Sequence, residues 1–175
     1  MNLPNKLTLG RIIAVPFFIL AYMLDWYLVA FAIFILASVT DMLDGKIARK
    51  YNLITTFGKV MDPLADKILV YSAFCLLIGD LIPAWMLIVI LTREFVVSGI
   101  RTVAASEGIV IAADMSGKIK TVLQMIAVPM LLIVPIIDNS IFYTISMVFL
   151  WASLIMTIYS GVEYVVKNRK VFTLK

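Results

Sequence analysis

Long runs of hydrophobic residues alternate with short polar segments along this chain. The runs are about 20 residues long, the length that an α-helix needs to cross the hydrocarbon core of a membrane. Pro83 suits the first turn of a helix. Pro129 and Pro135 should both bend the helix predicted at about residues 115–137. We therefore expect six helices, at about residues 7–24, 26–49, 57–79, 84–106, 115–137 and 141–166.

The second of these helices should be longer than its hydrophobic part. Its apolar run ends at Val39, but no helix-breaking residue follows before Asn52. We therefore expect the helix to project beyond the membrane and to carry the polar segment Asp41–Arg49.

Composition supports an all-α integral membrane protein. The mean hydropathy is +1.05, and charged residues make up 15% of the chain, against about 25% in soluble domains. We expect residues 1–175 to form a single membrane-embedded domain, because six spans leave no room for a soluble one. The single Cys75 and the absence of histidine exclude an internal disulfide and the usual zinc and haem sites.

The positions of the basic residues predict the orientation in the membrane. The connections near Asp25, Asp80 and Asp138 contain no Lys or Arg, so all 15 basic residues lie on the opposite side. By the positive-inside rule, both termini are expected in the cytoplasm. The basic C-terminal tail, with Lys167, Arg169, Lys170 and Lys175, could also serve to attract anionic lipid headgroups.

Four aspartates lie close to the predicted cytoplasmic surface at helical spacing. Asp41 and Asp44 are three residues apart and Asp62 and Asp66 four apart, so each pair shares one helix face. Uncompensated, four carboxylates in a membrane would cost on the order of 10 kcal/mol. An all-oxygen cage suits Mg²⁺ or Mn²⁺, and it could hold two ions about 3.5–4 Å apart. The alternative is that the aspartates cap helix ends and pair with Lys46, Lys59 and Lys67.

Small residues accompany the aspartates on the same faces. Gly45 and Ala48 lie on the face of the first pair, and Gly58 lies four residues before Asp62. They would leave a slot in which a flat ligand can approach the backbone. Arg49, at the end of the slot, offers a forked donor for a phosphate. The glycines by themselves are equally typical of helix packing.

The whole pattern, D-x2-D-G-x2-A-R-x8-G-x3-D-x3-D, resembles the signature of the CDP-alcohol phosphotransferases at every fixed position. The resemblance implies six transmembrane helices, a polar cavity that faces the cytoplasm, a homodimer and a place in the bacterial cell membrane. It implies that Asp66 is the general base, and that metal is bound by Asp41, Asp44, Asp62 and Asp66. The CDP moiety would be held by Asp41, Gly45, Ala48, Arg49, Gly58 and Asp62.

Shorter motifs at residues 62–67, 92–95, 98–101 and 116–121 look like the branch of this family that uses glycerol 3-phosphate. The implied reaction joins this acceptor to the phosphatidyl group of CDP-diacylglycerol and releases CMP. A dianionic acceptor needs cations of its own, and the candidates for its phosphate are Arg101, Lys118, Arg93, Arg11, Thr8 and Lys120. Arg93 could instead pair with Glu94 as a structural lock, Lys120 could contact lipid headgroups, and Thr8 could be an ordinary helix-face hydroxyl.

The expected partners are CDP-diacylglycerol, glycerol 3-phosphate, membrane lipid and a second copy of the chain, with no nucleic acid. Within the family, the acceptor could instead be inositol phosphate, serine or phosphatidylglycerol. A small cation or proton transporter would need carboxylates throughout the membrane depth, but the non-cytoplasmic half holds only three, all at loops. A structural subunit is a further alternative, since Ser153, Thr157 and Gly161 form a small-residue stripe suited to helix packing.

Overall fold

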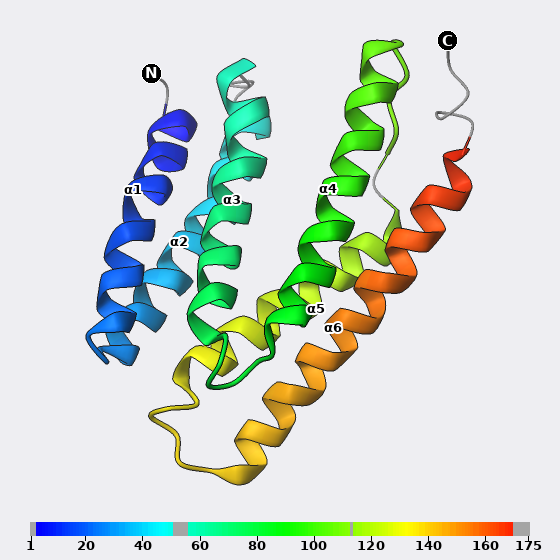
Figure 1. The fold of residues 1–175 in the computed structure, drawn as a ribbon. Helices are drawn as coiled ribbons and strands as arrows, with labels where there is room; N and C mark the ends of the chain where they lie inside the picture. Colours follow the sequence, from blue (N-terminus) through cyan, green and yellow to red (C-terminus); the bar gives the residue numbers. More distant parts are fainter. Residues whose placement is uncertain (1–2, 51–55, 113, 170–175) are drawn as a thin grey trace. The chain divides into compact units, whose positions relative to one another are not determined.

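The computed structural model describes residues 3–50, 56–112 and 114–169, without the side chains of residues 3–4, 42–50, 56–60 and 63. All six elements of the described part are helices (Figure 1). They are α1 (Leu3–Met23), α2 (Tyr27–Lys50), α3 (Thr56–Leu77), α4 (Ala84–Ser106), α5 (Met115–Ile133) and α6 (Ser140–Lys167).

Helix bounds follow the hydropathy pattern closely, with two corrections. The first helix was expected from about residue 7, but α1 begins at Leu3. The structure confirms that α2 continues past its apolar part to Lys50 and that α4 begins directly after Pro83. The prediction that the fifth helix reaches residue 137 with a bend at Pro135 is wrong, because α5 ends at Ile133 and includes only Pro129. The residue before a proline is disfavoured in the α conformation, so the helix stops just ahead of Val134.

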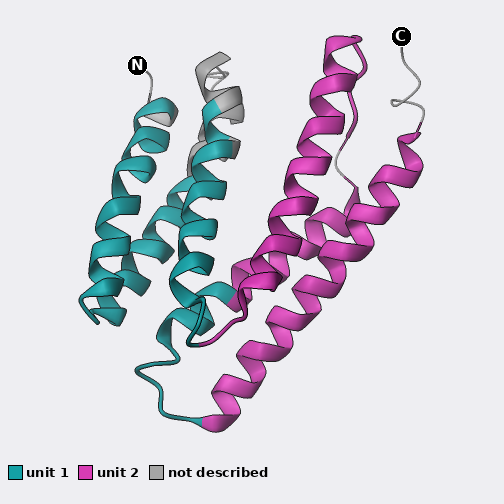
Figure 2. Cartoon of the chain, viewed as in Figure 1, with its two compact units in different colours: residues 1–80, 128–139 teal, residues 81–127, 140–175 magenta. Residues whose placement is uncertain are grey.

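The chain divides into two compact units, drawn in different colours in Figure 2. Unit 1 comprises residues 1–80 and 128–139, and α1 packs there against both α2 and α3. The rings of Phe18 and Phe34 meet with centroids 6.0 Å apart, and both side chains are fully buried. Ala65 and Phe74 of α3 are equally buried. This packing fixes the side chains of α1 opposite those of α2 and α3.

Unit 2 comprises residues 81–127 and 140–175, and α4 packs there against α6. Its hydrophobic cluster joins Val97, Ile100 and Ala104 of α4 to Tyr164 of α6. Trp85 and Trp151 add a tilted ring pair with centroids 5.9 Å apart. Arg101 of α4 contacts Tyr164, a member of this cluster.

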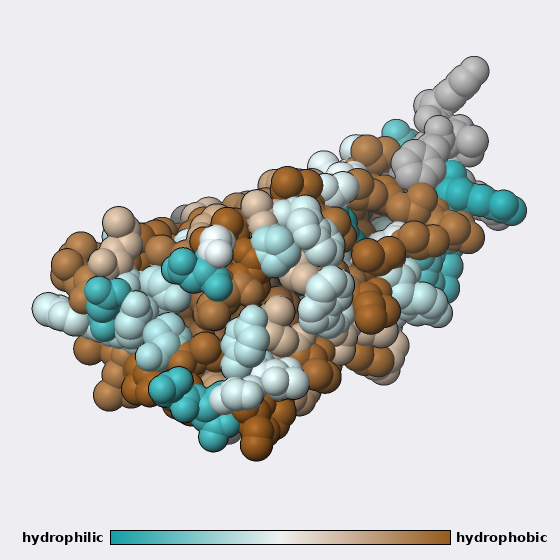
Figure 3. Space-filling view, turned by 60° about the horizontal axis from the view of Figure 1, so that its bottom comes forward, coloured by the Kyte–Doolittle hydropathy of each residue, from teal (hydrophilic) through white to brown (hydrophobic). Residues whose placement is uncertain are grey.

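The outer surfaces of the helices are hydrophobic. Hydrophobic residues are spread across the face drawn in Figure 3, and side chains such as Phe17, Ile88 and Ile155 are more than 60% exposed. By length and composition, three described segments could cross a membrane: Asn5–Met23, Met115–Ile133 and Ser140–Lys167. The apolar part of α2, Tyr27–Asp41, is shorter, and α3 and α4 carry charged residues within their length. Exposed apolar helices of this kind are typical of an integral membrane protein.

Candidate active site

Two of the aspartates, Asp41 of α2 and Asp62 of α3, contact polar residues of α1. Arg11 places its Nη1 atom 2.5 Å from Oδ1 of Asp41, and the Thr8 hydroxyl donates a 2.5 Å hydrogen bond to Oδ1 of Asp62. Thr8 and the Arg11 side chain are both fully buried. The carboxylates of Asp41 and Asp62 lie close enough for their like charges to interact. One face of α1 therefore brings a cation and a hydroxyl to the two carboxylates.

Of the residues predicted to bind the acceptor phosphate, Thr8 and Arg11 contact the aspartates Asp62 and Asp41. Both residues were expected near the phosphate of the acceptor, and the structure puts them on the aspartates. A buried guanidinium beside Asp41 offsets part of the electrostatic cost of holding that carboxylate away from water. Contact of Thr8 or Arg11 with an acceptor remains a proposal.

The metal site expected at the aspartates is only partly described. The side chains of Asp44, Gly45, Ala48, Arg49 and Gly58 lie outside the described residues. Among the side chains that are described, no three acidic, histidine or cysteine residues form a metal site. Asp41 and Asp62 present only carboxylate oxygens, which are the ligands that hard divalent cations prefer. The donor chemistry of the described part therefore fits Mg²⁺ or Mn²⁺.

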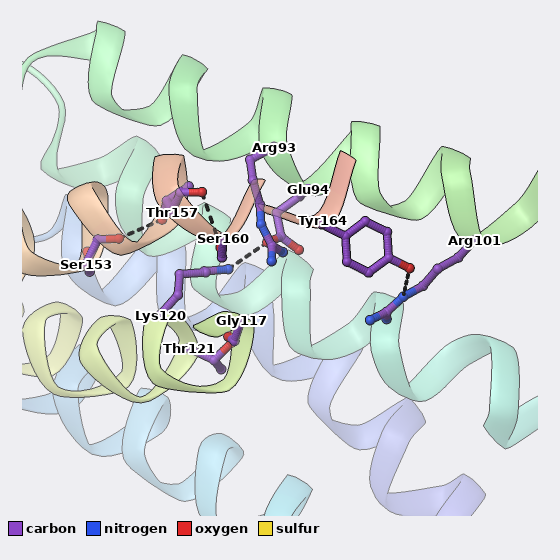
Figure 4. A network of polar contacts seen from close by, with 10 residues as sticks. All are labelled: Arg93, Glu94, Arg101, Gly117, Lys120, Thr121, Ser153, Thr157, Ser160 and Tyr164. Atoms are coloured by element: carbon purple, nitrogen blue, oxygen red, sulfur yellow. Dashed lines mark hydrogen bonds and ion pairs between the residues drawn. The ribbon is translucent and has the colours of Figure 1, made fainter. Parts of the chain in front are cut away.

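A second polar cluster lies in unit 2, where Glu94 of α4 joins two cations (Figure 4). Its Oε1 atom accepts a 2.6 Å bond from Nζ of Lys120 on α5 and a 2.8 Å bond from Nη1 of Arg93. The three side chains are only 6–13% exposed. The predicted Arg93–Glu94 pairing is therefore present, and Lys120 belongs to it as well.

Two glycines make room for the Arg93 side chain. A Cβ atom built on Gly161 of α6 would lie 2.9 Å from Cγ of Arg93, and one on Gly117 of α5 would lie 3.0 Å from Nη2. Ser153 and Thr157, the other members of the small-residue stripe, donate their hydroxyls to carbonyls of their own helix. The stripe thus serves internal packing in unit 2, where its glycine admits a charged side chain.

Arg101 and Lys118, the first two candidates for the acceptor phosphate, are both exposed. Arg101 donates through Nε to the hydroxyl of Tyr164, 3.1 Å away, and its guanidinium carbon lies 5.5 Å from the centroid of the tyrosine ring. Lys118 stands in the first turn of α5, and its backbone N–H donates to the carbonyl oxygen of Asp114. Neither Arg101 nor Lys118 forms an ion pair with a carboxylate among the described side chains, whereas Arg93 and Lys120 both pair with Glu94.

Sequence reasoning missed two residues of α6 that touch this region. Glu163 accepts a 2.5 Å bond from the Ser116 hydroxyl and a 2.6 Å bond from Lys167, which ties the first turn of α5 to α6. Tyr164 holds Arg101 as described above. The four-residue spacing of Glu163 and Lys167 indicates that these two pair with each other. No local pattern indicates that Glu163 contacts Ser116, 47 positions earlier, or that Tyr164 contacts Arg101, 63 positions earlier.

These features define an all-helical membrane protein with paired aspartates on two neighbouring helices and a separate set of cations. The family model for CDP-alcohol phosphatidyltransferases matches residues 1–159. The chain therefore belongs to the CDP-alcohol phosphatidyltransferase family, as its aspartate signature predicted.

Curated relatives cover nearly the whole chain. It is similar to the CDP-diacylglycerol–glycerol-3-phosphate 3-phosphatidyltransferase of Bacillus subtilis, with 45% identity over 95% of either chain. A protein of the same name from Rickettsia bellii is 40% identical over 98% of this chain and 97% of its own. A third, from Sodalis glossinidius, is 34% identical over 97% and 96%.

Proposed function

We propose that this protein transfers the phosphatidyl group of CDP-diacylglycerol to glycerol 3-phosphate, giving phosphatidylglycerol phosphate and CMP. It would thus be a phosphatidylglycerophosphate synthase. The observation that carries the proposal is similarity over nearly the full chain to relatives that bear the name of this activity. The exposed cations of unit 2 support it, because they suit an anionic acceptor.

The donor would be held at the aspartate signature. Gly45, Ala48, Arg49 and Gly58, with Asp41 and Asp62, would bind the CDP moiety. Asp41, Asp44, Asp62 and Asp66 would hold Mg²⁺ or Mn²⁺, as two ions. When bound, such ions neutralise phosphate charge and polarise the phosphorus under attack. The contacts of α1 with Asp41 and Asp62 would keep these two carboxylates oriented toward the site.

Asp66 would act as the general base. Its carboxylate takes the proton of the acceptor hydroxyl while the hydroxyl oxygen forms a bond to the phosphorus linked to diacylglycerol. The bond between that phosphorus and the CMP oxygen breaks, and CMP leaves. Proton transfer of this kind contributes typically 10²–10⁴-fold to the rate.

The acceptor phosphate would be bound chiefly by Arg101 and Lys118. Both are exposed, whereas Arg93 and Lys120 share the carboxylate of Glu94 and so carry a net charge of only one with it. We assign Arg93 and Lys120, together with Thr8 and Arg11, supporting roles in binding the acceptor phosphate. The acyl chains of the donor need no pocket, since they can remain in lipid.

The setting we propose is a bacterial cell membrane crossed by all six helices. Both termini and the active site would face the cytoplasm, where the basic residues lie. The protein would act as a homodimer.

The decisive experiment is release of CMP from CDP-diacylglycerol by purified protein. Glycerol 3-phosphate, inositol phosphate, serine and phosphatidylglycerol would be tested one at a time with Mg²⁺ or Mn²⁺, and again with EDTA. We expect turnover with glycerol 3-phosphate that EDTA abolishes and added metal restores. Turnover with a different acceptor alone would refute the assigned acceptor, and no CMP release with any of them would favour a transporter or structural subunit.

A further inference from the structure

Tyr164 combines a buried ring with a hydroxyl that reaches an exposed cation. Only 1% of the residue is exposed, and its ring packs with Val97, Ile100 and Ala104 of α4. Its hydroxyl oxygen accepts the 3.1 Å bond from Nε of Arg101, and the guanidinium carbon lies within cation–π range of the ring. Figure 4 shows Arg101 reaching from α4 to the tyrosine. The anchor of this contact is therefore rigid, although the arginine itself is exposed.

The contact leaves the outer end of the guanidinium available. An arginine has five N–H donors in a planar fork, and the tyrosine occupies only the one on Nε. Among the described residues, the four N–H groups of the two terminal nitrogens have no hydrogen-bond partner. They match two oxygens of a phosphate in a bidentate arrangement. Within the described part of the chain, no carboxylate lies within ion-pair distance of Arg101. Its charge is thus oriented, and no described carboxylate neutralises it.

We propose that Tyr164 is a positioning residue for the acceptor. By accepting the Nε–H bond, it restricts the guanidinium to one orientation, with both terminal nitrogens presented to the phosphate of the incoming acceptor. An exposed arginine without such an anchor loses considerable side-chain freedom when it binds a ligand. With the anchor, part of that ordering is already present before binding. This inference rests on the proposed function, because it takes the acceptor to be a phosphate monoester.

The test is the substitution Tyr164→Phe, which keeps the buried ring and removes only the hydroxyl. Steady-state kinetics would vary glycerol 3-phosphate and CDP-diacylglycerol in turn. We expect the KM for glycerol 3-phosphate to rise roughly 2- to 12-fold, the effect of one lost hydrogen bond. The KM for CDP-diacylglycerol and kcat should stay within about twofold of wild type, within the scatter expected when no hydrogen bond is lost.

Two further variants separate positioning from packing. Tyr159→Phe removes an exposed hydroxyl from the same helix and should leave both KM values unchanged. In a protein that already carries Arg101→Ala, adding Tyr164→Phe should produce no further rise, because the hydroxyl acts through the arginine. An equal effect of Tyr164→Phe with and without Arg101 would overturn the proposal, since it would reveal a general packing role.

The outcomes also separate this proposal from the proposed function. Wild-type protein that releases no CMP with glycerol 3-phosphate would refute the proposed function, and the role of Tyr164 with it. Wild-type protein that uses glycerol 3-phosphate, while Tyr164→Phe retains the wild-type KM, would refute the role of Tyr164 alone.

Discussion

Replacing Glu94 by alanine should destabilise the protein more than any replacement of an exposed acidic residue. Glu94 accepts the 2.6 Å bond from Lys120 and the 2.8 Å bond from Arg93, and all three side chains are largely buried. Glu94→Ala would remove the carboxylate that both of these buried cations share. Breaking a buried ion pair by removing one partner costs roughly 3–5 kcal/mol.

The expected shift is large enough to measure by thermal unfolding in detergent or lipid. For a chain of this length, each kcal/mol lowers Tm by about 2–4 °C, so Glu94→Ala should lower Tm by about 6–20 °C. Glu94→Gln should lower it less, because the amide oxygen can still accept a hydrogen bond from Lys120.

Glu107→Ala is the matched control. Glu107 is an exposed acidic residue at the end of the same helix, and exposed substitutions usually change stability by about 0.5 kcal/mol or less. A Tm for Glu94→Ala within about 2 °C of the Glu107→Ala value would refute the reasoning. It would show that the ion pairs of Glu94 with Arg93 and Lys120 contribute no more to stability than an exposed ion pair.

Three more predictions follow from the site and its packing. Asp66→Asn should lower kcat at least ~10²-fold while the KM for CDP-diacylglycerol is retained, because it removes the base, whereas the residues assigned to the CDP moiety and the other three metal-binding aspartates stay in place. Arg101→Ala and Lys118→Ala should each raise the KM for glycerol 3-phosphate about 10- to 150-fold, since a charge-assisted bond contributes roughly 1.5–3 kcal/mol. Gly161→Ala should destabilise the protein by about 1–3 kcal/mol in thermal unfolding, because the added methyl group would lie 2.9 Å from Cγ of Arg93, near the backbone end of that side chain.

Each of these predictions has an outcome that would contradict it. Near wild-type turnover of Asp66→Asn would show that another group takes the proton. A raised KM for CDP-diacylglycerol beside an unchanged one for glycerol 3-phosphate would assign Arg101 and Lys118 to the donor. Gly99→Ala is the control for Gly161, because its added methyl group meets nothing within 4 Å and alanine is the better helix former. Equal stability of the two alanine variants would disprove the close packing of Arg93.

Helices and family could be predicted from the sequence by itself, because both depend on local patterns. Long apolar runs set the six helices, and the absence of a breaker before Asn52 extended α2 to Lys50. Pro83 marked the start of α4. Two ends were misjudged: α1 begins at Leu3 and not near residue 7, and the proline at 135 stops α5 instead of bending it. The aspartate signature is likewise a matter of spacing along the chain, and it identified the family that the family model then matched.

The partners of the charged residues were decided by tertiary structure. The contacts of Arg11 with Asp41 and of Thr8 with Asp62 arise from helix packing in unit 1, and the sequence did not predict them. Glu94 bonds to Lys120, which is 26 positions further along the chain. Arg101 bonds to Tyr164, which is 63 positions further along. Hydropathy says which face of a helix is buried, but which residue stands opposite depends on how two helices pack and at what relative height. Those quantities are properties of the assembled helices, so no local pattern encodes them.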